Sequence, residues 1–299
     1  MKIYYGSKDV WKDVTGICWA KLRHHDHIII PAGDMNRTSF FSDPLYGTLK
    51  SIRIETSSTT HTYDHRANIK VHIKSEHIVV KSYADPTVEN QLFSLHDKLT
   101  FHHGSLNDEF PEQCMVAHYF TGNETVLEIG GNIGRNSVII ASLVDNQKYV
   151  VVECDPVSCD QLRENRDANQ FTFAIEDSAL SNQKLIQNGW ETYPSEVLVD
   201  GFKWVKTIDY HSFREKYPLR FDTLVLDCEG AFYYILKSMP TILDHIKLIL
   251  VENDYPTIEQ KIEVDSTLKL LGFYRDYVQP GGLDWLPCKH FFFEVWIRD

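Results

Sequence analysis

The sequence predicts an α/β fold, in which a mostly parallel sheet is covered by helices on both faces and preceded by a small β-rich domain. From about residue 115 onward, short apolar runs alternate with helical segments, and a glycine-rich turn follows the first run. Continuous apolar strands joined by helical crossovers are typical of a parallel sheet. The preceding part gives short β-type runs separated by turn residues, which indicates an antiparallel arrangement. We therefore expect domains at residues 1–95 and 96–299.

Hydrophobic periodicity places the individual elements. Apolar and polar residues alternate in residues 69–73 (IKVHI), as in a strand with one buried face. The strands predicted in the first domain are Lys2–Tyr5, His27–Ile30, Leu49–Glu55, Asn68–Ile73 and His77–Ser82. Those predicted in the second domain are Thr125–Ile129, Tyr149–Glu153, Phe171–Ile175, Thr223–Asp227, Ile246–Glu252 and Phe291–Ile297, with helices at Arg135–Leu143 and Val157–Asn169. The stretch Ser181–Phe202 has no clear period, so we expect a long loop there.

Composition restricts the partners and the location. The net charge of −12 disfavours nucleic acid, because affinity for the phosphate backbone comes from Lys and Arg. The N-terminal residues do not resemble a signal peptide, and no apolar run is long enough to span a membrane. The six cysteines lack CxxC spacing, which favours reduced thiols in a cytoplasmic protein over a zinc site or a disulfide framework.

The strongest motif is the glycine-rich segment at residues 126–135, VLEIGGNIGR. An apolar strand carrying Glu128 leads into a tight turn with Gly130, Gly131, Asn132 and Gly134. Glycine lets the backbone approach a ligand closely, and ligands of open α/β sheets bind at the carboxyl ends of the strands. The spacing does not fit the dinucleotide pattern GxGxxG, and no Gly-Lys-Ser/Thr follows as in a P-loop. The segment instead has the pattern E-x-G-x-N-x-G.

A second acidic residue, Glu153, ends the next predicted strand. A carboxylate at this position can accept hydrogen bonds from both ribose hydroxyls of a nucleoside. The alternative is that Glu153 only caps the helix that begins near Asp155-Pro156. Its position beside the glycine-rich turn favours the nucleoside.

Five motifs resemble those of the FkbM-type methyltransferases, which are class I enzymes that O-methylate sugars and polyketide-like products. They are residues 126–134, the ECDP segment at 153–156 with Leu162, Asn165 and Asn169, the ALS segment at 179–181, the DCEGA segment at 227–231 and the VEND segment at 251–254. The resemblance covers roughly residues 115–275 and implies a Rossmann-like class I methyltransferase sheet. The first domain, together with this version of the motifs, is similar to glycan-modifying proteins of large DNA viruses, which would place the protein in the host cytoplasm.

The resemblance implies S-adenosylmethionine as cofactor. We expect its binding residues to be Glu128, Gly130, Gly131, Asn132, Gly134 and Glu153, with the adenine edge near Asp177 or Ser178. Two positions depart from the family pattern. Glu128 replaces the usual Asp, and Val225 stands where the family carries a lysine, so the role of that lysine is not transferred.

Methyl transfer to a sugar hydroxyl requires positioning of the acceptor and removal of its proton. In one arrangement Asp227 takes the proton, assisted by Glu229 or a histidine. In another, Asp227, Glu252 and Asn253 hold Mg²⁺ or a similar hard cation, as in catechol-type O-methyltransferases. A third interpretation gives Asp227 only a role in cofactor or loop geometry.

Two further groups of residues have both a functional and a structural interpretation. Gln187, Trp190 and Tyr193 would suit sugar stacking and hydrogen bonding, or would belong to a packed surface loop. The histidines of residues 24–27 (HHDH), with His61 and His65, would bind a metal or lie on the surface.

The sequence thus favours an S-adenosylmethionine-dependent O-methyltransferase that acts on a sugar hydroxyl in glycan biosynthesis. The alternatives are a glycan-binding module with an inactive methyltransferase-like domain, and a methyltransferase of a non-sugar small molecule. The expected partner is a carbohydrate rather than a nucleic acid.

Overall fold

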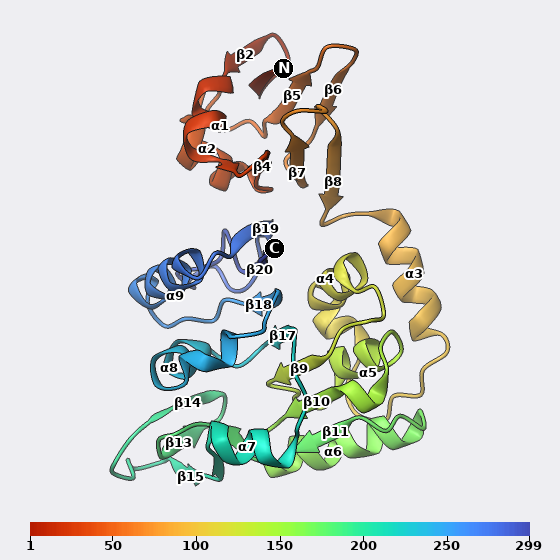
Figure 1. The fold of residues 1–299 in the computed structure, drawn as a ribbon, viewed down its shortest axis with the longest axis vertical. Coiled ribbons are helices and arrows are strands. Elements are labelled where there is room, and N and C mark those ends of the chain that lie inside the picture. Colours follow the sequence, from red (N-terminus) through yellow and green to blue (C-terminus); the bar gives the residue numbers. More distant parts are fainter.

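A computed structural model describes residues 1–299. Its largest element is a seven-stranded sheet with strand order β11-β10-β9-β17-β18-β20-β19 (Figure 1). The strands are β9 (Val126–Ile129), β10 (Tyr149–Val152), β11 (Ala174–Glu176), β17 (Thr223–Leu226), β18 (Leu248–Glu252), β19 (Tyr274–Gln279) and β20 (Phe293–Ile297). The first five are parallel to one another, and β20 is antiparallel to both of its neighbours. The predicted mostly parallel sheet is confirmed.

Helices cover both faces of this sheet. In Figure 1, α4 and α5 lie on one side of the central strands, and α8 and α9 lie on the other. The helices of this region are α3 (Pro86–His96), α4 (Phe110–Tyr119), α5 (Arg135–Ala141), α6 (Pro156–Ala168), α7 (Tyr210–Lys216), α8 (Phe232–Ser238) and α9 (Ile258–Leu270), with short 3-10 turns η1 (Leu106–Glu109), η2 (Asn146–Lys148) and η3 (Pro240–Leu243). None of the helices has the length and apolar character needed to cross a bilayer.

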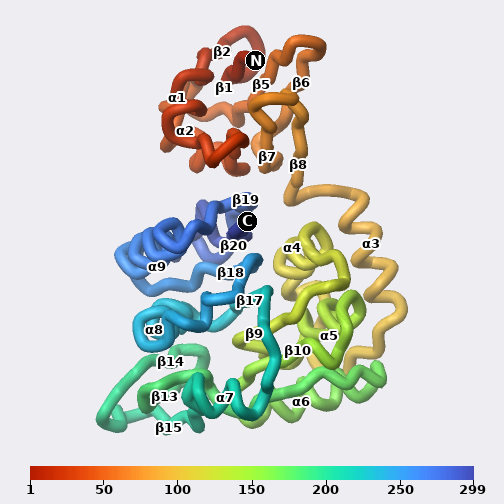
Figure 2. Tube along the Cα trace, viewed as in Figure 1, coloured from red at the N-terminus to blue at the C-terminus, as the bar shows by residue number.

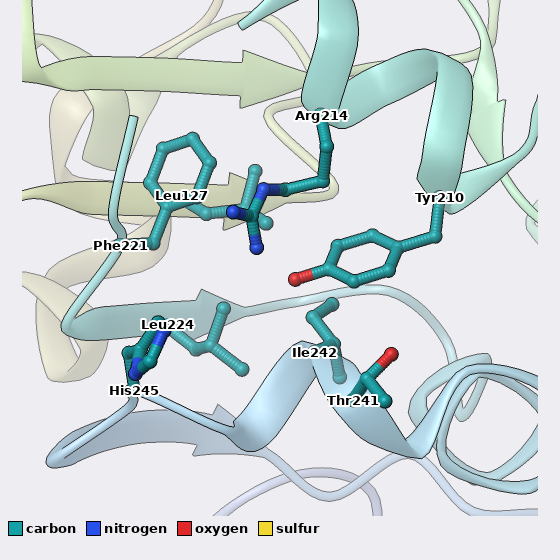
Figure 3. Close-up of a pocket in the computed structure, with 8 residues that line it drawn as sticks. All are labelled: Leu127, Tyr210, Arg214, Phe221, Leu224, Thr241, Ile242 and His245. Atoms are coloured by element: carbon teal, nitrogen blue, oxygen red, sulfur yellow. The ribbon is translucent and has the colours of Figure 1, made fainter. Parts of the chain in front are cut away.

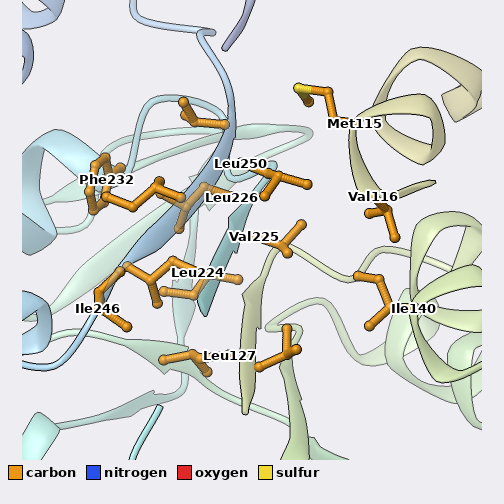
Figure 4. Packing of buried hydrophobic residues seen from close by; sticks show 14 of the residues in the cluster. Met115, Val116, Leu127, Ile140, Leu224, Val225, Leu226, Phe232, Ile246 and Leu250 are labelled. Atoms are coloured by element: carbon orange, nitrogen blue, oxygen red, sulfur yellow. The ribbon is translucent and has the colours of Figure 1, made fainter. Parts of the chain in front are cut away.

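The core lies between these layers. Leu127, Leu224 and Leu250 come from three adjacent strands and are almost completely buried. Ile140 of α5 packs on one side and Phe232 of α8 on the other (Figure 4). Because the central strands are mostly apolar and buried on both faces, each face needs a covering helix, as the sequence predicts.

Strand β11 begins at Ala174, three residues later than predicted. The end of α6 explains the difference. The Phe171 N–H donates to the Arg166 carbonyl, and Gln170 adopts a left-handed conformation with φ +58°. This geometry is a helix C-cap, so residues 170–171 finish the helix instead of starting the strand.

Residues 2–82 form two antiparallel sheets, in agreement with the expected β-rich first part. Their strand orders are β2-β1-β5-β6 and β3-β4-β7-β8. The elements are β1 (Lys2–Ser7), β2 (Val10–Asp13), α1 (Thr15–Lys21), β3 (Arg23–His24), β4 (His27–Ile30), α2 (Asp34–Phe41), β5 (Ser51–Glu55), β6 (Thr60–Tyr63), β7 (Ala67–His72) and β8 (Ile78–Ser82). Ile3, Ile30, Ile52 and Ile69 are fully buried between the sheets and the helices.

Helix α3 connects the two parts. Figure 2 shows the chain leaving β8 and running along the side of the larger unit as α3. Val88 and Leu92 of α3 belong to the core of the larger unit. Residues 86–95, which the sequence assigns to the first domain, therefore pack with the second.

The stretch Ser181–Phe202 is not a structureless loop, so this prediction is wrong. It forms most of a three-stranded antiparallel sheet made of β13 (Leu185–Asn188), β14 (Glu191–Pro194) and β15 (Lys203–Val205). A parallel pair, β12 (Ala179–Leu180) and β16 (Thr207–Ile208), joins its base. Gly189, with φ +59°, allows the tight turn between β13 and β14. We refer to residues 185–205 as the flap.

Candidate active site

Four strand ends meet along one edge of the large sheet. In the parallel register Ile129 lies opposite Val152 and Leu226, and Leu226 lies opposite Val251. The residues that follow are therefore side by side: Gly130, Glu153, Asp227 and Glu252. This edge is where open α/β sheets bind their ligands.

The glycine-rich turn is packed so tightly that two of its positions require glycine. Gly130 has φ +92°, and a Cβ there would lie 1.6 Å from the Asp227 carbonyl oxygen. Gly134 has φ +91°, and its Cβ would lie 2.5 Å from the Leu162 side chain. The backbone N–H groups of Gly130 and Gly131 both donate to the Val152 carbonyl, which ties the turn to the end of β10.

Glu153 fixes the other side of the turn. Its carboxylate accepts hydrogen bonds from the backbone N–H of Asn132 and of Asp155, each at 2.7 Å. The residue is only 9% exposed, and burial raises the pKa of its carboxyl group. Each oxygen retains a lone pair, so Glu153 can still accept hydrogen bonds from a ligand that lies in front of it.

A cavity of about 480 Å³ opens in front of the ends of β9, β10 and β17, and Glu252 at the end of β18 does not line it. The glycine-rich turn, the loops after β10 and β17, and the flap enclose it. The lining residues are Ile129, Gly130, Asn132, Val152, Glu153, Cys154, Asp155, Ser158, Ala179, Leu180, Leu185, Gln187, Gly189, Trp190, Thr192, Asp227, Cys228, Glu229, Ala231 and Ile235.

A second hollow, between α7 and η3, is too small to be a ligand site. Figure 3 shows it between Tyr210, Arg214 and His245. Its volume is about 10 Å³, which is at most the room that one water molecule needs.

Five of the residues expected at the site line the large cavity: Gly130, Asn132, Glu153, Asp227 and Glu229. Asn132 and Glu229 both have left-handed backbones, with φ +46° and +50°. Such strained conformations of residues other than glycine cluster at functional sites.

Glu128, Gly131 and Gly134 lie behind the cavity wall instead. Glu128 is buried and accepts hydrogen bonds from the hydroxyls of Ser137, at 2.6 Å, and Tyr149. Burial raises its pKa to about 7. Its carboxylate therefore holds β9, β10 and α5 together, and a Cβ on either glycine would collide with Val151 or Leu162. These residues shape the turn and do not contact the cavity.

Asp177 and Ser178, where the sequence places the adenine edge, do not line the cavity either. The Asp177 carboxylate points to the surface and pairs with Lys206 and Arg163. The Ser178 hydroxyl donates to Glu176 at 2.5 Å. In this part of the wall the lining residues are Leu180 and, from the flap, Gln187.

Asp227 and Glu252 are brought together, but their third neighbour is Glu112 of α4 and not Asn253. One carboxylate oxygen from each of Glu112, Asp227 and Glu252 lies within 4.8 Å of the others. Asn253 uses its side-chain amide to donate to the Phe291 carbonyl and so fixes the segment before β20. Glu112 could not be predicted as a partner because it is more than a hundred residues away in the sequence.

The three carboxylates belong to a larger acidic group with little compensating positive charge. Arg135 pairs with Glu109 at 3.0 Å. Burial and neighbouring negative charge raise the pKa of Asp227, and they raise the pKa of Glu109 and of Asp254 to about 7. Glu112 is 7% exposed, and its Oε2 atom is buried without a hydrogen-bond partner. This region can therefore bind a cation or hold protons.

The flap lies over the side of the cavity next to Cys154 and Asp155. Lys203 of β15 pairs with Asp155 at the N-terminus of α6, at 2.7 Å. Gln187 and Trp190 line the cavity, whereas Tyr193 packs edge-to-face against Phe202, with ring centroids 5.4 Å apart. Of the three residues expected to suit sugar stacking, two therefore reach the cavity.

The histidine-rich segment belongs to the N-terminal sheets and is distant in sequence from the residues that line the cavity. Asp26 accepts hydrogen bonds from His27, at 2.8 Å, and from His72 of β7, at 2.9 Å. Their mutual hydrogen bonds account for the close approach of the three side chains, and Asp26 is exposed.

No model of a known protein family matches the chain, and no curated protein matches it. Several solved structures are similar over part of their length. A ribosomal protein L11 methylase from Lactobacillus delbrueckii subsp. bulgaricus is 13% identical, with 67% of this chain and 82% of that chain covered and a TM-score of 0.41. An O-methyltransferase from Bacillus cereus in complex with SAH is 12% identical, with 72% and 92% covered and a TM-score of 0.38. A putative O-methyltransferase from Klebsiella pneumoniae is 13% identical, with 72% and 91% covered and a TM-score of 0.36.

Proposed function

We propose that this protein is an S-adenosylmethionine-dependent O-methyltransferase that methylates a sugar hydroxyl in glycan biosynthesis. The observation that carries the proposal is that a single cavity is lined by the glycine-rich turn, by Glu153 and by the carboxylates of Asp227 and Glu229. A nucleoside-binding half and a proton-accepting half thus adjoin each other. The resemblance of the motifs to FkbM-type enzymes supports the same activity.

The residues present fit the cofactor. The volume of the cavity lies within the range of small-molecule sites. Glu153 can accept hydrogen bonds from ribose hydroxyls beside the backbone of the glycine-rich turn. A dinucleotide fits less well, because the turn lacks the GxGxxG pattern and the sheet ends in an antiparallel strand instead of a sixth parallel one. When bound, S-adenosylmethionine supplies a methyl group activated by its sulfonium centre.

The chain must then orient the acceptor and take its proton. Asp227 is the candidate general base, because it lines the cavity at the end of the central strand β17. Burial and the charges of Glu109 and Glu112 raise its pKa. A raised pKa makes the ionised carboxylate a better proton acceptor for a weakly acidic sugar hydroxyl. Glu229 lines the same wall and can hold the acceptor by a hydrogen bond.

The second arrangement is a divalent cation such as Mg²⁺ held by Glu112, Asp227 and Glu252. Three carboxylates from three elements offer the hard oxygen donors that this ion prefers. The close approach of the buried Glu112 and Glu252 carboxyls supports it, since either a cation or a shared proton must offset their mutual repulsion. A cation would lower the pKa of an acceptor hydroxyl and orient it.

The acidic wall also favours an uncharged acceptor rich in hydroxyl groups. Carboxylates repel the phosphates of a nucleic acid, and the whole chain carries a net charge of −12. Carboxylates accept hydrogen bonds from sugar hydroxyls well. We place the reaction in the cytoplasm, in line with six unpaired cysteines.

Transfer of label from methyl-tritiated S-adenosylmethionine to a panel of oligosaccharides tests this function. We expect label in an alkali-stable methyl ether, and we expect Asp227→Asn to lose turnover while it keeps affinity for S-adenosylhomocysteine. The loss in turnover should be at least about a hundredfold, as for removal of a general base. Equal loss of both properties would place Asp227 in the cofactor site.

The same assay separates the alternatives. Labelling that requires added Mg²⁺ and disappears with EDTA supports the cation, whereas labelling unchanged by either supports the metal-free base. A protein that binds glycans but transfers no label to any acceptor would be a binding module. Label in RNA or in a non-sugar small molecule would contradict the carbohydrate acceptor.

A further inference from the structure

Strand β13 of the flap carries one polar side chain into the cavity. Gln187 lines the cavity and is only 7% exposed. Its Oε1 atom is buried and has no hydrogen-bond partner. Its Nε2 atom has only a weak contact, 3.9 Å from the Cys154 sulfur. Both halves of the amide are therefore uncommitted.

An uncommitted amide in this position points to a ligand. Burying an amide without hydrogen bonds is unfavourable, and such groups are rare in folded proteins. Tertiary packing does not require it, because the adjoining lining residues Leu180 and Leu185 are apolar and an apolar side chain would pack equally well. The missing partner must offer one acceptor and one donor close together.

The position of Gln187 along the wall indicates which part of a ligand it meets. It adjoins Cys154, the residue after Glu153. A nucleoside whose ribose is held by Glu153 would direct its base toward this apolar end, away from Asp227 and Glu229. The base would then lie between Cys154 and Leu180, with its polar edge toward the flap.

We propose that Gln187 recognises the amino edge of the adenine base, a role that rests on the proposed function. Adenine presents a donor, the N6 amino group, beside the acceptor N7, and glutamine pairs with both at once. Among the side chains that line the cavity, only that of Gln187 has a buried polar atom without a hydrogen-bond partner. It thus takes the role that the sequence assigned to Asp177 or Ser178.

Calorimetric titration of the full chain with two ligands tests the assignment. One ligand is S-adenosylhomocysteine. The other is S-inosylhomocysteine, in which an oxo group replaces the amino group, so that the base offers an acceptor where the amide needs a donor. We expect the wild-type protein to bind the adenosyl compound at least about tenfold more tightly, since a bidentate pair with a base gives discrimination of this order.

The variant Gln187→Leu should lose most of this preference, with weaker binding of the adenosyl compound and nearly unchanged binding of the inosyl compound. Gln183→Leu, on the same segment but exposed, serves as the matched control and should keep the preference. Because Gln187→Leu removes an unpaired buried amide, its melting temperature without ligand should not fall.

Two results would overturn the assignment. The first is that the wild-type protein binds both ligands with equal affinity, a result that can be obtained without any variant. The second is that the Gln187→Leu protein folds and still prefers the adenosyl compound to the full extent. No binding of S-adenosylhomocysteine by the wild-type protein would refute the proposed function itself, together with this role.

Discussion

Individual carboxylates at the strand ends have distinct roles that follow from their surroundings. Glu153 faces the cavity with lone pairs to spare, whereas Glu128, one strand away, is enclosed by Ser137 and Tyr149. The first is therefore suited to ligand binding and the second to stability. The sequence motif contains both acids but does not separate these roles, because the direction of a side chain depends on its neighbours in space.

Removal of the Glu153 carboxylate should weaken cofactor binding. Glu153→Ala loses the ribose hydrogen bonds and the support of the Asn132 backbone, so affinity for S-adenosylhomocysteine should fall about ten- to a hundredfold. Calorimetry measures the change. Glu153→Gln keeps a hydrogen-bond acceptor, so its affinity for S-adenosylhomocysteine should lie between those of the wild-type protein and Glu153→Ala. Asp160→Ala, on the exposed side of α6, is the control and should bind with the affinity of the wild-type protein. Unchanged affinity in Glu153→Ala would show that the ribose does not lie here.

Glu128 should make stability depend on pH. Its pKa is about 7 in the folded chain against an ordinary value of 4.5, because burial disfavours the charged form. Between these values the folded state holds a proton that the unfolded state has released, so the free energy of unfolding should fall as pH rises through this range. The slope contributed by this group is at most about 1.4 kcal/mol per pH unit.

Urea unfolding of the wild-type protein and of Glu128→Gln, at several pH values from 4.5 to 8, isolates this contribution. The difference between their free energies of unfolding should decline across the window, since the amide cannot ionise but still accepts the hydroxyl hydrogen bonds. A difference that stays constant with pH would mean that Glu128 does not retain its proton in the folded protein.

Among the elements, the flap is where prediction from sequence fails most clearly. The strands β10, β17 and β18 are recognisable because they consist mainly of β-branched and other apolar residues. Strand β19, with the sequence YRDYVQ, lacks this pattern and was missed. The flap has short strands in which polar and aromatic residues are mixed. Which of its side chains are buried depends on the cavity beneath it, and the local sequence does not show this. Helices α3, α4, α7, α8 and α9 were also missed.

The flap should open more readily when its contact with α6 is lost. Lys203→Ala removes the ion pair with Asp155, which is partly exposed and contributes at most about 1 kcal/mol to stability. Stability should therefore change little, while S-adenosylhomocysteine dissociates several-fold faster in stopped-flow measurements. Lys184→Ala, whose ion pair with Glu196 does not involve α6, is the control. Equal dissociation rates would mean that this contact does not hold the flap closed.

At the scale of the whole molecule, one buried acid joins the N-terminal sheets to the large sheet. Asp276 of β19 is 5% exposed and contacts Lys70, Lys81 and the Tyr119 hydroxyl at 3.2, 2.9 and 2.8 Å. Burial alone would raise the pKa of Asp276, but the charges of the two lysines lower it below its ordinary value. Asn68 adds a reciprocal pair of hydrogen bonds with the Val278 backbone.

Loss of this charge should loosen the attachment of the N-terminal sheets. We expect Asp276→Asn to reduce the free energy of unfolding by about 3 kcal/mol, because the two partly buried lysines lose their partner. Limited proteolysis should then cut the chain near α3. Asp284→Asn is the control, since that side chain is fully exposed. If both variants resisted protease equally, the junction would depend on other contacts.

Long-range contacts of this kind explain what the sequence leaves undetermined. The fold class and the strand-end motifs follow from local patterns. Four of the five predicted residues that line the cavity end a predicted strand or lie in the turn after one: Gly130, Asn132, Glu153 and Asp227. Glu112 and Asp276 act through partners far away in the chain, and no local pattern in a single sequence marks them. Gln187 is singled out from the sequence, but as a residue for sugar binding, because its place in the cavity wall depends on how the flap folds.

The central claim is that the cavity in front of β9, β10 and β17 binds an adenosyl sulfonium compound. A crystal structure of the full chain grown with S-adenosylhomocysteine tests it most directly. We predict the ribose hydroxyls against Glu153, the base beside Gln187 and the sulfur facing Asp227. A cavity that stays empty at saturating ligand, or that instead takes up a dinucleotide, would contradict the account.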